Sequence, residues 1–159
     1  VALDLGCGSG LGGAEIRAGC RHLTGVDLSP QMLALARARA LYDRLEQAEI
    51  GAWLAGCGAS FDLILACDSL IYFGDLRQVV VPAARRLRTG GYFVFSLELG
   101  DRAPFKLNDN GRYSHHPDEI RAVASEAGLQ VARLERGYLR MEYGAEVEGL
   151  LIALGPGGA

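Results

Sequence analysis

Runs of apolar residues alternate along the chain with segments whose apolar positions recur at helical spacing. Four runs are apolar at almost every position, at Val1–Leu5, Leu23–Val26, Phe61–Cys67 and Tyr92–Leu97, and weaker ones lie near Arg44–Ile50, Gln130–Arg136 and Val147–Leu154. Strands of the first kind are covered on both faces, which is typical of a parallel sheet. The alternation of strand and helix therefore predicts a right-handed, doubly wound α/β fold.

The segments between the strands carry helix boundary signals. Ser29-Pro30 places a capping residue and a first-turn proline before one helix. Asp75 caps the next helix in this interpretation, with Gln78 as its capping-box partner, and Pro82 is expected to kink it. Pro117 opens a third helix.

Composition limits the possible functions of the chain. Its 159 residues, 22% of them charged, suit one folded domain. The net charge of −3 gives no general attraction to nucleic acid or anionic membrane, and no apolar stretch approaches the ~20 residues that cross a bilayer. Cys7, Cys20, Cys57 and Cys67 show no C-x-x-C spacing, so we expect no metal or redox motif and a cytoplasmic location.

The first strand ends in a glycine-rich turn between two acids. Asp4 precedes Gly6, Gly8 and Gly10, and the second strand ends in Asp27. Alternating glycines let the backbone approach a ligand and present N–H groups at a helix start, which suits a carboxylate or a phosphate. S-adenosylmethionine offers a carboxylate for the turn, an ammonium for Asp4 and a ribose diol for Asp27.

Two other interpretations of the turn stay open. Gly8-x-Gly10-x-x-Gly13 formally fits a dinucleotide fingerprint, with Asp27 at the ribose position. In that case Asp4 would face the charge of a pyrophosphate, which costs energy. The other alternative is a tight turn that binds no ligand.

Five acids fall at or just after predicted strand ends, where ligands of doubly wound folds bind: Asp4, Asp27, Glu49, Asp68 and Glu98. Simpler roles compete for some of them. Asp27 and Asp68 are also placed to cap the segments that follow them, and Glu98 is also placed to be a solvated charge at the rim.

The segments DLGCGSG, GVDLSPQMLALAR, FDLILACDSLIYFGDL and LRTGGYFVFSLE follow one another as do the motifs of class I S-adenosylmethionine-dependent methyltransferases, which the chain resembles. The closing GRYSHHPDEIRAVASEAGL and GYLRMEYGAEVEGLLIAL are similar to a bacterial group that carries tetratricopeptide repeats. In that group the repeats would precede Val1, so a helical-repeat segment upstream is a possible partner.

The resemblance implies a three-layer α/β/α domain over residues 1–154, with a mostly parallel, seven-stranded, Rossmann-like sheet. Its last strand, at Val147–Leu154, would be antiparallel to the others. We expect the chain to be a fragment truncated before the first strand, because Val1 already lies inside a strand, and we expect residues 155–159 to form a disordered tail.

The resemblance also implies a cofactor site. Asp4 and the Gly6–Gly10 backbone would hold the methionine end, Asp27 the ribose, Leu28 and Glu49 the adenine, while Asp68 and Ser69 would line the cofactor and face the substrate. The cofactor-binding set is Asp4, Gly6, Cys7, Gly8, Gly10, Asp27, Leu28, Glu49, Asp68 and Ser69.

Candidate substrate and catalytic residues follow the third and fourth strong runs. Tyr72 is a candidate for the substrate wall, and the long connection Leu99–His116, of a length typical of binding loops, adds Arg112, Tyr113 and His116. His115 is a candidate general base, because imidazole titrates near neutral pH. The alternatives are a surface histidine for His115 and a residue that merely precedes the helix for His116.

The function predicted from these residues is methyl transfer from S-adenosylmethionine to a small molecule, with S-adenosylhomocysteine as product. Neither nucleic acid nor a membrane is an expected direct partner. The alternatives are a nicotinamide-dependent oxidoreductase that uses the same turn, and a non-catalytic cofactor-binding module.

Overall fold

The computed structural model describes residues 1–102 and 104–157. Its strands are β1 (Ala2–Leu5), β2 (Leu23–Asp27), β3 (Arg44–Gln47), β4 (Phe61–Ala66), β5 (Leu87–Leu99), β6 (Phe105–Leu107), β7 (Tyr113–His115), β8 (Gln130–Glu142) and β9 (Ala145–Gly155). Its α-helices are α1 (Leu11–Ile16), α2 (Pro30–Ala38), α3 (Ile50–Gly56), α4 (Arg77–Ala84) and α5 (Pro117–Glu126), with 3₁₀ turns at Arg17–Gly19 and Leu70–Tyr72.

The strands form one sheet in which β1 is flanked by β2 and β4, with β3 beyond β2 and β5 beyond β4. These five strands run parallel, whereas β9 is antiparallel to β5 and to β8. The predicted fold class, mostly parallel with an antiparallel last strand, is confirmed. Because the strand order reverses between β1 and β4, a crevice for a ligand is expected outside the carboxyl ends of these two strands.

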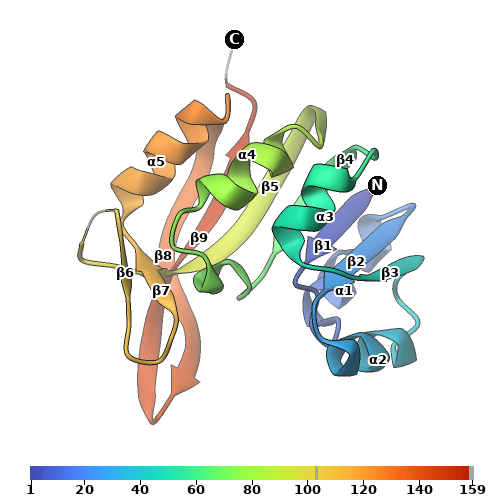
Figure 1. The fold of residues 1–159 in the computed structure, drawn as a ribbon, viewed down its shortest axis with the longest axis horizontal. Helices are drawn as coiled ribbons and strands as arrows, with labels where there is room; N and C mark the ends of the chain where they lie inside the picture. The colour runs from blue at the N-terminus through green and yellow to red at the C-terminus, as the bar shows by residue number, and fades with distance from the viewer. Residues whose placement is uncertain (103, 158–159) are drawn as a thin grey trace.

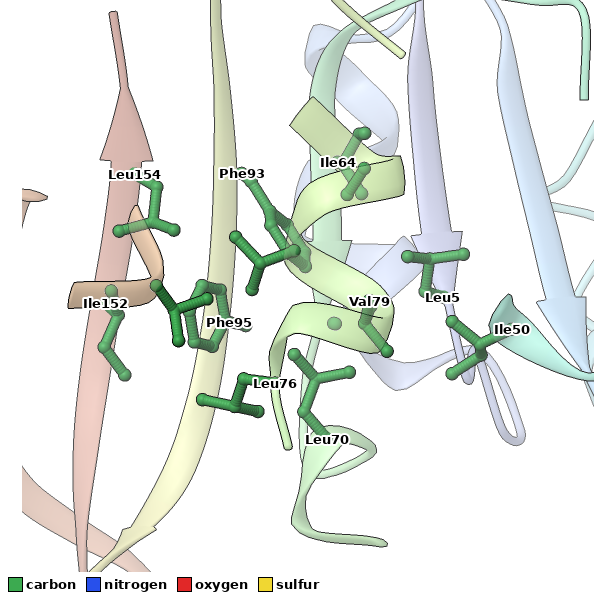
Figure 2. Packing of buried hydrophobic residues seen from close by; sticks show 14 of the residues in the cluster. Leu5, Ile50, Ile64, Leu70, Leu76, Val79, Phe93, Phe95, Ile152 and Leu154 are labelled. Carbon is green, nitrogen blue, oxygen red and sulfur yellow. The ribbon is translucent and has the colours of Figure 1, made fainter. Parts of the chain in front are cut away.

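Helices flank the sheet, and α3, α4 and α5 lie in a row over one of its faces (Figure 1). The core lies between that row and the sheet. Figure 2 shows side chains of β1, β4, β5 and β9 along this layer, together with Val79 of α4. Phe93 and Phe95 of β5 are almost fully buried there, with ring centroids 4.7 Å apart.

The helix boundaries agree only in part with the predicted signals. The Ser29 hydroxyl accepts the Met32 N–H at 3.3 Å and caps α2 as predicted. Asp75 accepts the N–H of Arg77 at 3.0 Å, but α4 begins one residue later than an Asp75 cap requires, and its N-cap residue is Leu76. The predicted capping box is therefore wrong, while Pro82 lies inside α4.

Three segments near the carboxyl end of the chain differ from the sequence pattern. The glycine pair Gly90–Gly91, which resembles a helix stop, lies within a β5 that starts at Leu87. The long connection Leu99–His116 contains the antiparallel pair β6 and β7, and β7 pairs with the end of β5. Of the predicted tail, Gly155 is the last residue of β9, and residues 158 and 159 lie outside the described residues.

Among the described residues, no helix has the length and apolar character needed to cross a membrane.

Replacing Phe93 with alanine should lower the free energy of unfolding by about 3–5 kcal/mol, because the change removes a buried ring and leaves a cavity. Urea unfolding measures this loss. Leu107→Ala on β6 is the control, because Leu107 is 56% exposed and its truncation should cost at most about 0.5 kcal/mol. Equal losses for the two variants would contradict this account of the core.

Candidate active site

A cavity of about 870 Å³ opens at the carboxyl ends of β1 to β4. Its lining includes ten residues predicted from sequence, namely Asp4, Gly6, Cys7, Gly8, Asp27, Leu28, Glu49, Asp68, Ser69 and Tyr72. The other predicted residues, Gly10, Arg112, Tyr113, His115 and His116, are not part of its lining. The structure thus gathers four of the five strand-end acids around one cavity.

Asp27 fastens the glycine turn to the start of α2. One of its carboxylate oxygens, Oδ2, accepts the N–H of Gly8 at 2.8 Å, and Oδ1 accepts the N–H of Ser29 at 2.8 Å. Gly8 has a φ of +53°, in the left-handed region that favours glycine. Because each carboxylate oxygen accepts more than one hydrogen bond, Asp27 keeps acceptor capacity for a ligand hydroxyl.

Asp4 is a buried carboxyl group, only 1% exposed, under the turn. Its Oδ2 accepts the Tyr42 hydroxyl at 2.7 Å. Burial raises its pKa to about 6, and the Tyr42 hydroxyl and the Gly13 N–H offset part of this effect, whereas Asp27 adds to it. Asp4 is therefore an anion at neutral pH that is held in a poorly solvated place.

Two thiols share the cavity with this carboxylate. Burial, together with the charges of Asp4 and Asp27, raises the pKa of Cys7 to about 12. Cys67 is exposed at the cavity, but desolvation of its sulfur and the charges of Asp4 and Asp68 raise its pKa to about 11. Both groups are neutral thiols at physiological pH and so are poor nucleophiles.

Glu49 and Ser69 line the cavity while their polar atoms bind the backbone. The two Glu49 carboxylate oxygens accept the N–H groups of Gly51 at 2.8 Å and Ala52 at 2.7 Å, which makes Glu49 the N-cap of α3. The Ser69 hydroxyl donates to the Leu5 carbonyl at 3.0 Å. A Cβ at Gly6 would lie 2.4 Å from the Ser69 Cβ, so this contact requires glycine at position 6.

Asp68 connects the cavity to a group of charged residues from β5, β8 and the loop before β7. Its carboxylate lies 2.5 Å from the guanidinium of Arg140, which also pairs with Glu98 and, at 3.1 Å, with Glu142. Arg112 pairs with Glu142 at 2.5 Å. We call Asp68, Glu98, Arg112, Arg140 and Glu142 the Arg140 cluster; it accounts for the position of Arg112, a predicted substrate residue.

His115, the predicted general base, is fully buried. Its Nε2 lies 2.9 Å from the Phe73 carbonyl and 3.1 Å from the Gly74 carbonyl, so Nε2 carries the proton and donates. Burial lowers the pKa of this histidine, although the two carbonyls act in the opposite direction. These contacts make His115 a structural link between β7 and the loop after β4. They do not place its ring for proton transfer in the cavity.

Tyr113 and His116 also have structural contacts. The Tyr113 ring packs edge-on against Phe105, with centroids 5.7 Å apart. His116 is the N-cap of α5, where its Nδ1 accepts the Asp118 N–H at 3.3 Å. These contacts agree with the simpler interpretation of His116, as the residue that precedes the helix.

Comparison with known proteins identifies the family to which these motifs belong. A family described as the methyltransferase domain matches residues 3–95, more than half of the chain. The chain belongs to the methyltransferase domain family.

A ubiquinone biosynthesis O-methyltransferase from Aromatoleum aromaticum is 29% identical to this methyltransferase domain over 154 residues. The match covers 83% of the chain and 64% of that relative, less than two thirds of its length.

Solved structures share the fold. An S-adenosylmethionine-dependent methyltransferase from Clostridium acetobutylicum has a TM-score of 0.76 at 20% identity, over 99% of the chain and 84% of that protein. The magnesium protoporphyrin IX methyltransferase of Synechocystis, solved with bound S-adenosylmethionine, has a TM-score of 0.74 at 17% identity, over 99% and 70% of the two chains. At these identities the likeness shows the fold.

Sequence reasoning missed part of the site of this methyltransferase domain. The cavity wall also contains Leu11, Met32 and Cys67, which follow the same strand ends and could have been found from that position. Tyr42 lies outside the motifs, in the connection between α2 and β3, and the chain shows no local signal for its bond to Asp4.

Asp4→Asn should raise the free energy of unfolding of the ligand-free domain at neutral pH by about 1–3 kcal/mol, because an ionised Asp4 pays a burial penalty. The folded-state pKa of about 6 lies above the ordinary 3.8, so the penalty is complete above pH 6 and disappears as the pH falls toward 3.8. Urea unfolding at a series of pH values measures the difference, with Asp109→Asn in an exposed loop as control. If the extra free energy of unfolding of Asp4→Asn did not decrease at lower pH, the raised pKa of Asp4 would be contradicted.

Arg140→Met should lower the free energy of unfolding by about 2–4 kcal/mol, because it leaves the buried Glu98 without its closest cation. Arg133→Met is the matched control: the ion pair between Arg133 and Glu135 is exposed, and its loss should cost less than about 1 kcal/mol. Thermal and urea unfolding of both variants provide the comparison. Indistinguishable stabilities would show that the Arg140 cluster is only a surface feature.

Proposed function

We propose that this methyltransferase domain binds S-adenosylmethionine in the cavity and transfers its methyl group to a small-molecule acceptor, with S-adenosylhomocysteine as the second product. The observation that carries the proposal is the meeting of Asp4, Asp27 and the glycine turn around one cavity of about 870 Å³. In the reaction the acceptor forms a bond to the methyl carbon, and the carbon–sulfur bond breaks with its electrons moving to sulfur.

The residues fit the groups of this cofactor. The backbone of the glycine turn, which is also the start of α1, suits a carboxylate; Asp4 suits an ammonium; and the remaining acceptor capacity of Asp27 suits a ribose diol. Leu28, which is 66% exposed at the cavity, offers an apolar contact for adenine. Glu49 remains a candidate for the adenine amino group through acceptor capacity beyond its cap bonds.

When bound, S-adenosylmethionine supplies an already activated methyl group on a sulfonium. The chain therefore contributes mainly alignment of the acceptor, which in well-oriented reactions accounts for up to about 7–11 kcal/mol of the barrier. Asp68, Tyr72 and Phe73 form the wall of the cavity after β4, and we assign the acceptor side to them.

A small-molecule acceptor agrees with the named substrates of similar proteins, such as the Aromatoleum relative in ubiquinone biosynthesis. The closing segment of the chain supports membership of the tetratricopeptide-associated group, with helical repeats upstream in the parent protein. We also propose no direct nucleic-acid partner, because the net charge is −3, and a cytoplasmic location, because the four cysteines show no C-x-x-C spacing.

The structure disfavours the nicotinamide alternative. In the fingerprint Gly8-x-Gly10-x-x-Gly13, the space beside Gly10 and Gly13 is filled by the Tyr42 side chain. In the fingerprint it is the second glycine that lets the backbone approach the pyrophosphate. Here that glycine is Gly10, whose Cβ position faces the side chains of Tyr42 and Arg39.

Calorimetry with S-adenosylmethionine and S-adenosylhomocysteine should detect one site in this chain. Asp27→Ala should lower the affinity for both ligands by about 10–100-fold, the loss expected when hydrogen bonds to a charged group are removed. The same variant should also lower the affinity for 5′-methylthioadenosine, because this compound carries the same ribose as the other two ligands. Asp109→Ala, an exposed change, is the control.

Spectral titration with reduced nicotinamide dinucleotides separates the rival functions. Binding of these dinucleotides in place of the adenosyl-sulfur compounds would overturn the proposal. Tight cofactor binding without methyl transfer to any acceptor in a metabolite pool would favour the non-catalytic module.

A further inference from the structure

We propose that Tyr42 is a positioning residue that fixes the Asp4 carboxylate for the ammonium of an amino-acid-bearing ligand, an inference that rests on the proposed cofactor site. The phenol reaches Asp4 from the connection between α2 and β3, and Tyr42 is not among the residues that line the cavity. Its hydroxyl donates to Asp4 Oδ2 at 2.7 Å.

The chain leaves a cradle without Cβ atoms for the Tyr42 side chain. A Cβ at Gly13 would lie 2.2 Å from its hydroxyl oxygen, one at Gly25 would lie 2.8 Å from the ring, and one at Gly10 would lie 3.1 Å from it. Distances under 3.0 Å require something to shift, so Gly13 and Gly25 are incompatible with any larger residue while Tyr42 holds this position. Three glycines, one each from the turn, α1 and β2, thus leave the space that the Tyr42 side chain fills.

The backbone that carries Tyr42 is fixed on both sides. The N–H of Asp43 donates to the Leu23 carbonyl at 2.9 Å, and the Asp43 carboxylate accepts the N–H of Leu23 at 2.8 Å and pairs with Arg17 at 2.6 Å. On the preceding turn, Arg39 Nε donates to the Ser9 carbonyl at 2.8 Å. The tyrosine is therefore held against both the glycine turn and β2.

The bond gives Asp4 a fixed direction and favours its charged form. The phenol on Oδ2 restrains the rotation of the carboxylate, which keeps acceptor capacity for a ligand donor because each of its oxygens accepts more than one hydrogen bond. The titratable groups around Asp4 are Tyr42, Asp27, Cys7 and Cys67; none is a cation, so the phenol and the Gly13 N–H are what oppose the burial penalty. An incoming ammonium would complete the charge balance.

The test compares Tyr42→Phe with the unchanged chain by calorimetry, using two ligands. S-adenosylhomocysteine carries the amino-acid end, and 5′-methylthioadenosine lacks it. We expect the affinity for S-adenosylhomocysteine to fall about 5–20-fold at neutral pH, because Asp4 is then less well oriented and less fully ionised, and the affinity for 5′-methylthioadenosine to stay within about twofold. Tyr92→Phe on β5, with a 43% exposed side chain, is the control and should leave both affinities unchanged.

A second readout is the titration of the Asp4 carboxyl carbon by NMR, with and without the phenol hydroxyl. The variant should titrate at higher pH than the unchanged chain, because a donor to the charged form has been removed. The pH below which S-adenosylhomocysteine binding weakens should rise with it.

The outcomes separate this inference from the proposed function. Failure of the unchanged chain to bind S-adenosylhomocysteine would remove the proposed function and this inference with it. Binding by the unchanged chain, with equal losses for both ligands or no loss in Tyr42→Phe, would overturn the positioning role alone. An unmoved Asp4 titration would do the same.

Discussion

The burial of one carboxylate at the end of β1 is the constraint on which the site depends. A charge taken out of water needs hydrogen-bond donors, and Asp4 receives them from Tyr42 and the Gly13 N–H. The tyrosine reaches Asp4 only because no side chain stands at Gly13 or Gly25. Some of the glycines near the turn are therefore explained by the need to leave room for the tyrosine that supports Asp4, whether or not a ligand is bound.

The turn above Asp4 is held in shape by neighbouring strands. Asp27 at the end of β2 binds the Gly8 N–H, and Ser69 after β4 packs against Gly6. Asp27, Ser69 and Glu49 thus line the cavity and also fix a piece of backbone, which for Glu49 is the start of α3. Such double use gives a preformed site, because the directions of its carboxylates are set before a ligand arrives.

The sequence predicts the parts of the molecule that depend on local pattern. The apolar runs predicted the strong strands, and the acids after them met at one cavity because parallel strands bring their carboxyl ends to the same edge. The strands β6 and β7 have three residues each, too short for periodicity to reveal. The partners of Tyr42, His115 and Arg140 are 38, 42 and 72 positions away, so their roles follow from tertiary contacts. For the same reason no pattern distinguished the buried His115 from a histidine able to exchange protons.

The β6–β7 hairpin supports one particular wall of the cavity. The hairpin packs on Gly74 through Phe105 and Tyr113 and binds the Phe73 carbonyl through His115, so it supports only the wall that contains Tyr72 and Phe73. The other side of the cavity, to which we assign the nucleoside, is formed by the connections after β1, β2 and β3. Residue changes confined to this hairpin would therefore reshape one half of the cavity and leave the other half intact, which makes the two halves separable targets for altering specificity.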